Sequence, residues 1–176
     1  MVYVRGNAHD YDEWEAHGAS GWNYQNCLPY FKKLETHYCV TSDYTGCDGP
    51  VAISGGNNMR NPLYRAFIDA GVEAGYTETE DYNGYRQEGF GQKFMNVDAG
   101  IRASTSHAYL KRQRTNLTIV KHRLVTRIIF EDKTAVGVEY KVGNRVSRIN
   151  ANKEVILCAG AIGSPHLLQV LSLIHI

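Results

Sequence analysis

The sequence of 176 residues has no long apolar run and no excess of charge of either sign. A membrane-spanning helix needs about 20 consecutive apolar residues, and every apolar run here is much shorter. The formal net charge is +1, so the positive footprint of a nucleic-acid-binding surface is absent. The N-terminus also lacks the apolar core of a secretory signal peptide. These absences leave one ordinary globular domain, or a part of a larger one, as the expected class.

Metal-binding and disulfide patterns are also scarce. The four cysteines, Cys27, Cys39, Cys47 and Cys158, form no CxxC pair, and the seven histidines form no HExxH pair. This spacing fits no common zinc site, so we predict no metal. A disulfide between Cys39 and Cys47 stays open, but reduced thiols are expected because the cysteines show no disulfide framework.

The most informative stretch runs from Glu154 to Leu168. Its apolar residues 155–158 predict a buried strand that includes Cys158. Ser164 and Pro165 then predict the start of a helix, because a serine hydroxyl can cap free N–H groups and proline fits the first helical position. Between strand and helix lies a turn of small residues, namely Ala159, Gly160 and Ala161.

A turn without large side chains lets a ligand approach the backbone closely. The following helix N-terminus supplies unpaired N–H groups and a partial positive charge, which suit a phosphate group. The alternative is a plain strand–turn–helix unit that binds nothing, and such turns are common in α/β folds.

Helices dominate the first half of the sequence. Asp10 is expected to cap a helix that ends near Ala16, and Asn23 a second helix that Pro29 breaks or kinks. Asn61 and Pro62 predict a third helix that ends at Gly75, with a core-facing side made of Leu63, Ala66, Phe67, Ala70 and Ala74.

The connecting segments and the second half are expected to be loops and strands. Asn83 and Gly84 predict a tight turn at positive φ, and Ser104 or Thr105 is expected to cap a short helix. Five short strands are expected, at 50–54, 117–120, 125–130, 135–140 and 145–150, the last four as a meander before the Glu154 strand. The predicted fold class is therefore mixed α/β (α+β), with short helices, a β-meander and a terminal strand–turn–helix.

Several segments in fixed order resemble one family. They are YVRGN at 3–7, residues 22–31, DYNGYRQEGFG at 81–91, RAST at 102–105, AVGVE at 135–139 and ANKEVILCAGAIGSP at 151–165. Together they resemble the glucose–methanol–choline (GMC) flavoprotein oxidoreductases, most of all the bacterial choline-oxidising members. The resemblance covers nearly the whole chain.

This resemblance implies an FAD enzyme that oxidises an alcohol, most readily choline, to an aldehyde by hydride transfer to the flavin. It implies FAD contacts at Val125, beside the adenine, and at Ala159, Gly160 and Ala161, beside the adenosine and pyrophosphate. Met1 and Val2 match the loop under the flavin ring. Electrons would pass to an acceptor such as a quinone, in the cytoplasm or peripherally on the inner face of the cell membrane.

The family's GxGxxG pyrophosphate loop and its catalytic histidine have no match here, so no catalytic residue is assigned. Residues 1–170 are expected to be a central fragment of the FAD-binding and substrate region, inactive by itself. Residues 171–176 depart from the family and are expected to be a non-native tail. Two alternatives stay open: another GMC enzyme with a different alcohol, and a non-catalytic αβ ligand-binding module.

Overall fold

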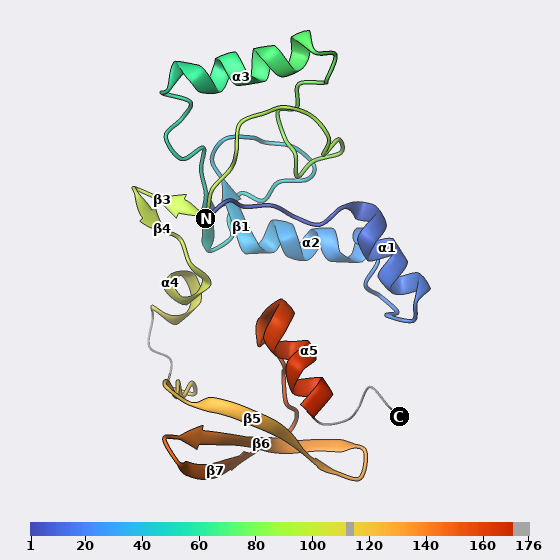
Figure 1. The fold of residues 1–176 in the computed structure, drawn as a ribbon, viewed down its shortest axis with the longest axis vertical. Coiled ribbons are helices and arrows are strands. Elements are labelled where there is room, and N and C mark those ends of the chain that lie inside the picture. The colour runs from blue at the N-terminus through green and yellow to red at the C-terminus, as the bar shows by residue number, and fades with distance from the viewer. Residues whose placement is uncertain (112–114, 171–176) are drawn as a thin grey trace. The chain divides into compact units, whose positions relative to one another are not determined.

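The computed structural model describes residues 1–111 and 115–170. The chain divides into two compact units, Met1–Gln113 (unit 1) and Arg114–Ile176 (unit 2), and each is described by itself. Both units combine helices with strands, which confirms the predicted mixed fold class (Figure 1). In the described part of the chain, no helix is both long enough and apolar enough to cross a bilayer.

Helix α1 (Ala8–Ala16) begins one turn earlier than predicted. The Asn7 side chain accepts a hydrogen bond from the N–H of His9, and the Asp10 carboxylate accepts one from the N–H of Asn7. The N-cap is therefore Asn7, and the expected cap, Asp10, is instead the third helical residue of a capping box.

Helix α2 (Tyr24–Leu34) begins at its predicted cap, Asn23, which accepts from the N–H of Asn26 at 2.9 Å. Of the expected break or kink at Pro29, the break is wrong, because the helix continues through Pro29 to Leu34. Proline removes one backbone hydrogen bond, and here the surrounding helical turns and their packing outweigh that loss.

Two short parallel strands form the centre of unit 1. Strand β1 (Glu35–His37) pairs with β2 (Val51–Ile53), so the expected strand near 50–54 is confirmed. The buried core lies on β2 and on segments that follow it in sequence, and consists of Val51, Ala52, Ile53, Phe94 and Ala103. Strand β2 is buried along its whole length, in keeping with its apolar sequence.

Helix α3 (Pro62–Glu73) has the predicted cap but not the predicted face. Asn61 accepts from the N–H of Leu63, and Gly75 follows the helix at a φ of +91°. However, Leu63 and Phe67 are 69% and 68% exposed, and the buried residues are Ile68 and Gly71. Helical periodicity locates an apolar stripe, but the packing partner decides which part of it is covered.

A hairpin and a short helix complete unit 1. Strands β3 (Val97–Asp98) and β4 (Ile101–Arg102) pair antiparallel across a turn. Helix α4 (Thr105–Leu110) follows, capped as predicted by Ser104, whose hydroxyl accepts from the N–H of His107.

Unit 2 contains an antiparallel meander of β5 (Leu124–Glu131), β6 (Thr134–Val142) and β7 (Arg145–Asn150). These strands match three predicted ones, and the turns fall at Asp132 and Gly143, both at positive φ. The strand expected at 117–120 is absent, because that segment pairs with no other strand.

The stretch from Glu154 to Leu168 differs from the predicted strand, turn and helix start. Residues 154–158 are not a strand, Ile156 is 74% exposed and Cys158 is exposed rather than buried. No other strand in the described residues pairs with this segment, so its apolar side chains have no sheet to join. Helix α5 (Gly160–Val170) starts before Ser164 and contains Pro165, so the predicted cap and first helical position are wrong.

Candidate cofactor site

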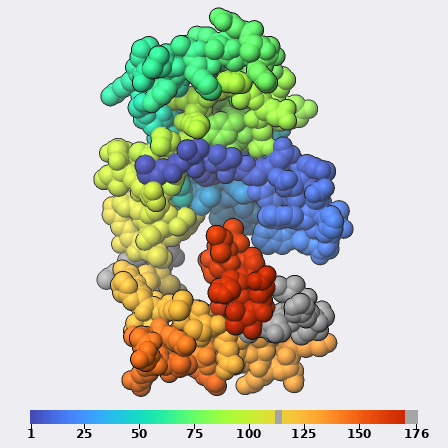
Figure 2. Space-filling view, in the orientation of Figure 1, coloured from blue at the N-terminus to red at the C-terminus, as the bar shows by residue number. Residues whose placement is uncertain are grey.

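The bend at the start of α5 exposes its main chain. Gly160 has a φ of +85°, and a Cβ added to it would meet no atom within 4 Å. Ala159, Gly160 and Ala161 are all exposed, and α5 has no buried residue. The atoms of α5 are drawn in red in Figure 2. The first N–H groups of a helix lack partners within the helix, so bare donors lie beside this open space.

Ser164 acts at this bend in a way the sequence did not predict. Its hydroxyl accepts a hydrogen bond from the N–H of Ala159 at 3.1 Å. The serine thus reaches back from the second turn of α5 and fixes the residue that enters the bend. The space over Gly160 stays free beside this contact. The residues at the bend fit a dinucleotide's pyrophosphate, because main-chain donors are exposed and no side chain covers them.

Val125 belongs to the same unit as the bend. It lies on β5, pairs with Tyr140 of β6 and is 37% exposed. Helix α5 contacts β5, so the structure brings this strand and the bend's helix together within unit 2. The pairing is irregular between Val125 and Arg127, which marks a bulge in the strand at this point.

Met1 and Val2 belong to unit 1, so the structure shows each half of the predicted site by itself. Their side chains are 51% and 48% exposed. Val2 forms a bridge with Met95, and the carbonyl of Met1 accepts from the N–H of Asn96. This end of the chain is therefore held by its backbone while its side chains stay accessible.

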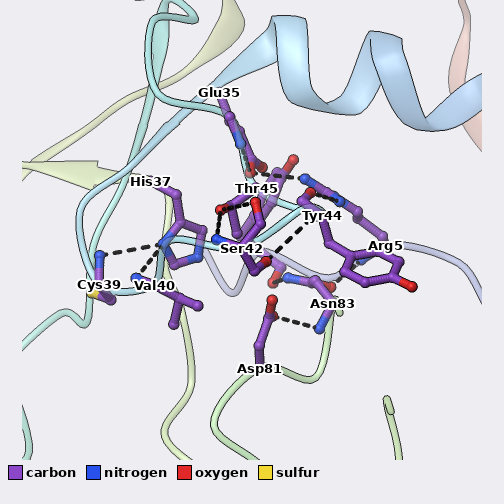
Figure 3. Close-up of polar contacts among 12 residues, drawn as sticks. Arg5, Glu35, His37, Cys39, Val40, Ser42, Tyr44, Thr45, Asp81 and Asn83 are labelled. Atoms are coloured by element: carbon purple, nitrogen blue, oxygen red, sulfur yellow. Dashed lines mark hydrogen bonds and ion pairs between the residues drawn. The ribbon is translucent and has the colours of Figure 1, made fainter. Parts of the chain in front are cut away.

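The residues that follow are held by a buried polar cluster that the sequence did not reveal (Figure 3). Arg5 and Glu35 form an ion pair at 2.8 Å with side chains 2% and 0% exposed. Arg5 donates from Nη1 to the carbonyl of Tyr44 and from its N–H to Oδ1 of Asn83. Burial, with the Glu35 carboxylate next in importance, raises the pKa of the nearby Tyr3 phenol.

Asn83 is part of the predicted turn, but its role differs from the prediction. The N–H of Gly84 does donate to the carbonyl of Asp81, yet neither Asn83 nor Gly84 has a positive φ. Asn83 is 2% exposed and also donates to the carbonyl of Tyr3. The turn therefore serves to present an amide to the N-terminal segment.

His37 lies in the same cluster, and its imidazole ring is neutral. Its Nδ1 accepts from the N–H groups of Cys39 and Val40, so the ring hydrogen is on Nε2. Burial lowers the pKa of His37, although the Glu35 and Asp81 carboxylates act in the opposite direction. No local sequence pattern predicts this cluster, because its members come from segments far apart in the sequence.

The cysteines and histidines are the residues that the sequence raised as candidates for disulfides and metal sites. All four cysteines are free thiols, so no disulfide joins Cys39 to Cys47. Within the described ranges, no group of three or more potential metal ligands comes together.

Solved structures with the same fold define the class of protein. One is an FAD-dependent oxidoreductase from Chaetomium thermophilum, with a TM-score of 0.85 and 32% identity over 96% of this chain and 32% of that one. Another is pyridoxine 4-oxidase from Mesorbium loti, with a TM-score of 0.83 and 32% identity over 96% of this chain and 34% of that one. The fold is thus that of a region of the FAD-dependent oxidoreductases.

The sequence model of the GMC oxidoreductases matches residues 1–173, so this chain belongs to the GMC oxidoreductase family. It is 56% identical over 173 residues to oxygen-dependent choline dehydrogenases from Photobacterium profundum and Vibrio vulnificus. The alignments cover 97% of this chain but only 30% and 31% of those proteins. The chain spans about a third of the length of these relatives. The family resemblance drawn from the sequence is confirmed.

Proposed function

We propose that this chain forms part of the FAD site of an enzyme that oxidises a primary alcohol to an aldehyde, with choline as the alcohol. FAD, when bound, supplies the acceptor for the hydride that leaves the alcohol carbon. The bend at 159–161 would present main-chain donors to its pyrophosphate, the backbone at Val125 would contact its adenine, and Met1 and Val2 would contact its flavin ring.

The observation that carries this proposal is the open bend at Gly160. A left-handed glycine with free space above it, next to a helix N-terminus, suits close approach of an anionic group to the backbone. It occurs in a chain 56% identical to choline dehydrogenases, which supports choline over other alcohols.

A chimera provides the test. Residues 1–170 replace the aligned segment of the Photobacterium profundum choline dehydrogenase, and purified protein is assayed for bound flavin and choline-dependent dye reduction. We expect both. Flavin without choline oxidation would contradict the substrate, and absence of flavin in a folded chimera would favour the non-catalytic ligand-binding module.

A different alcohol is the second candidate. The solved structure of pyridoxine 4-oxidase, at 32% identity, is the observation in its favour. The same chimera assayed with pyridoxine in place of choline separates the two, because only the second candidate expects oxidation of that ring alcohol.

Electron acceptor and location are part of the same proposal. We propose a quinone as acceptor and a position in the cytoplasm or peripherally on the inner face of the cell membrane. Both come from the family resemblance, and the described residues contain no helix able to span a membrane. Sedimentation of the full chain with and without lipid vesicles distinguishes the two locations.

The proposed domain organisation keeps residues 1–170 as one central region of the FAD-binding and substrate part. Residues 171–176 are proposed to be a non-native tail, and they lie outside the described residues. Sequencing the source across Val170 tests this, since an uninterrupted native read through Ile176 contradicts it.

A further inference from the structure

Unit 1 contains a pocket of about 650 Å³ between α3 and two loop segments. One segment is the loop 55–59, and the other is 91–95, which leads from the turn region into β3. Sites for small molecules typically have volumes in this range and are mostly apolar with a few polar groups. The pocket is therefore large enough to hold a small ligand.

Its walls are aromatic and thioether side chains. Tyr64 and Phe67 project from α3 and are 43% and 68% exposed, while Ile68, 5% exposed, closes the floor. Met59 and Met95 line the pocket from the two loop segments. Aromatic faces and polarisable methionine sulfur favour flat, apolar ligands.

Two polar groups at the pocket can donate to a ligand, the Tyr64 hydroxyl and the Lys93 ammonium. Asn57 donates from its side-chain amide to the Tyr64 hydroxyl, which leaves the phenol hydrogen free to point at a ligand. Gln92 donates to the carbonyl of Gly55, which fixes the loop against the segment 91–95. Lys93 contributes an exposed ammonium group.

The charge at the pocket disfavours cationic ligands. No carboxylate is among the lining residues, and none of the ion pairs in the described part of the chain includes Lys93. A cationic ligand such as choline would meet Lys93 without a counter-charge. A ligand with oxygen acceptors would instead receive a charge-assisted hydrogen bond.

The loop 55–59 keeps its shape at a conformational cost. Asn58 and Met59 have φ values of +50° and +58°, a region that residues with a Cβ rarely adopt. Such outliers occur where the surrounding structure enforces a particular geometry, often at ligand sites. Met59, one of these two residues, is among those that line the pocket.

From this lining we propose that the pocket binds a planar ring that carries carbonyl oxygens. The ring lies between Phe67 and the two methionines, and a carbonyl oxygen accepts from Lys93. Met95 also pairs with Val2, so the site adjoins the segment proposed to meet the flavin ring. A quinone belongs to this ligand class. That a quinone bound here accepts electrons rests on the proposed function. That the pocket binds a quinone does not depend on the proposed function.

The methionines provide a direct readout. The chain has three methionines, of which Met59 and Met95 line the pocket and Met1 does not. The full chain, labelled at its methionine methyl groups, is titrated with tetramethyl-1,4-benzoquinone and followed by NMR. This quinone is fully methylated, so thiols find no unsubstituted ring carbon. We expect saturable shifts at Met59 and Met95, with Met1 moving far less.

Two exposed residues give matched variants. Lys93→Met removes the ammonium and is expected to weaken binding about ten-fold, the size of one charge-assisted hydrogen bond. Lys33→Met, at an exposed position on α2, is the control and leaves affinity unchanged. Phe67→Ala tests the aromatic wall and is expected to weaken binding as well.

Three results would overturn the proposal: equal shifts at all three methionines, unchanged affinity in Lys93→Met, or choline binding as tightly as the quinone. The titration uses no flavin and measures no oxidation. Its failure would therefore leave the chimera assay of the proposed function untouched, and failure of the chimera would leave the pocket intact.

Discussion

The Nη2 atom of Arg5 lies 2.8 Å from Oε1 of Glu35, with both side chains almost completely buried. The N–H of Gly46 also donates a hydrogen bond to Oε1 of Glu35, at 3.0 Å. The pair thus joins the N-terminal segment to β1 and to the loop between β1 and β2.

Removing the charge of Glu35 is expected to destabilise the chain strongly. Glu35→Gln leaves the Arg5 guanidinium buried without a counter-charge, and breaking a buried pair in this way costs about 3–5 kcal/mol. Urea unfolding followed by tryptophan fluorescence measures the loss. The control is Arg65→Gln, which breaks the exposed pairs of Arg65 with Asp69 and Glu78 and is expected to cost far less. Similar losses in the two variants would contradict a special role for the buried pair.

Stability is expected to fall in mild acid because of His37. Its pKa is lower in the folded chain than in the unfolded chain, so the unfolded chain binds more protons below the unfolded value of about 6.5. Stability is therefore fully present above that pH and decreases as pH falls toward the folded pKa. Unfolding free energies measured between neutral pH and mild acid should show this slope.

Replacing the His37 ring provides the matched comparison. In His37→Asn, an amide oxygen can take the place of Nδ1 as acceptor for the N–H groups of Cys39 and Val40, but it does not titrate. The acid slope should become shallower in this variant. His166→Asn, at an exposed position on α5, is the control for replacing a histidine. An unchanged slope in His37→Asn would assign the acid sensitivity to other groups.

Gly160→Val in the chimera is expected to reduce flavin content. The left-handed φ of +85° disfavours any residue with a Cβ by about 1–2 kcal/mol, and the branched side chain would fill the open space over the bend. Bound flavin is measured from the visible spectrum of the purified protein. Gly143→Val, at the left-handed turn between β6 and β7 where an added Cβ likewise meets no atom within 4 Å, is the control and should keep its flavin. Equal flavin content in the two variants would refute contact at this bend.

The isolated chain is expected to bind FAD poorly and to show no choline-dependent dye reduction. The described contacts offer a bend, one strand position and one terminal segment, which is little to offset the loss of freedom of a large cofactor. The visible spectrum of the purified chain, and titration with FAD, measure this. Stoichiometric flavin absorbance would show that the chain alone holds the cofactor.

Local signals in the sequence located much of the fold. Asn23, Asn61 and Ser104 cap the helices that follow them, because a cap depends only on a side chain and the next three residues. The strands at 124–131, 134–142 and 145–150 follow from short apolar segments separated by turns. The failures at residues 154–158 and at Leu63 and Phe67 share a cause, since a residue's apolar character does not supply the partner that would bury it.

The candidate site likewise has features that the sequence predicted and features that only the tertiary structure decided. The sequence alone determined that residues 159–161 are small and lie near the start of a helix, because composition is local. Only the tertiary structure decided that Gly160 is left-handed with open space above it, and that Ser164 bonds back to Ala159. It also decided that Arg5 meets Glu35, because contacts between distant segments depend on how the whole unit packs.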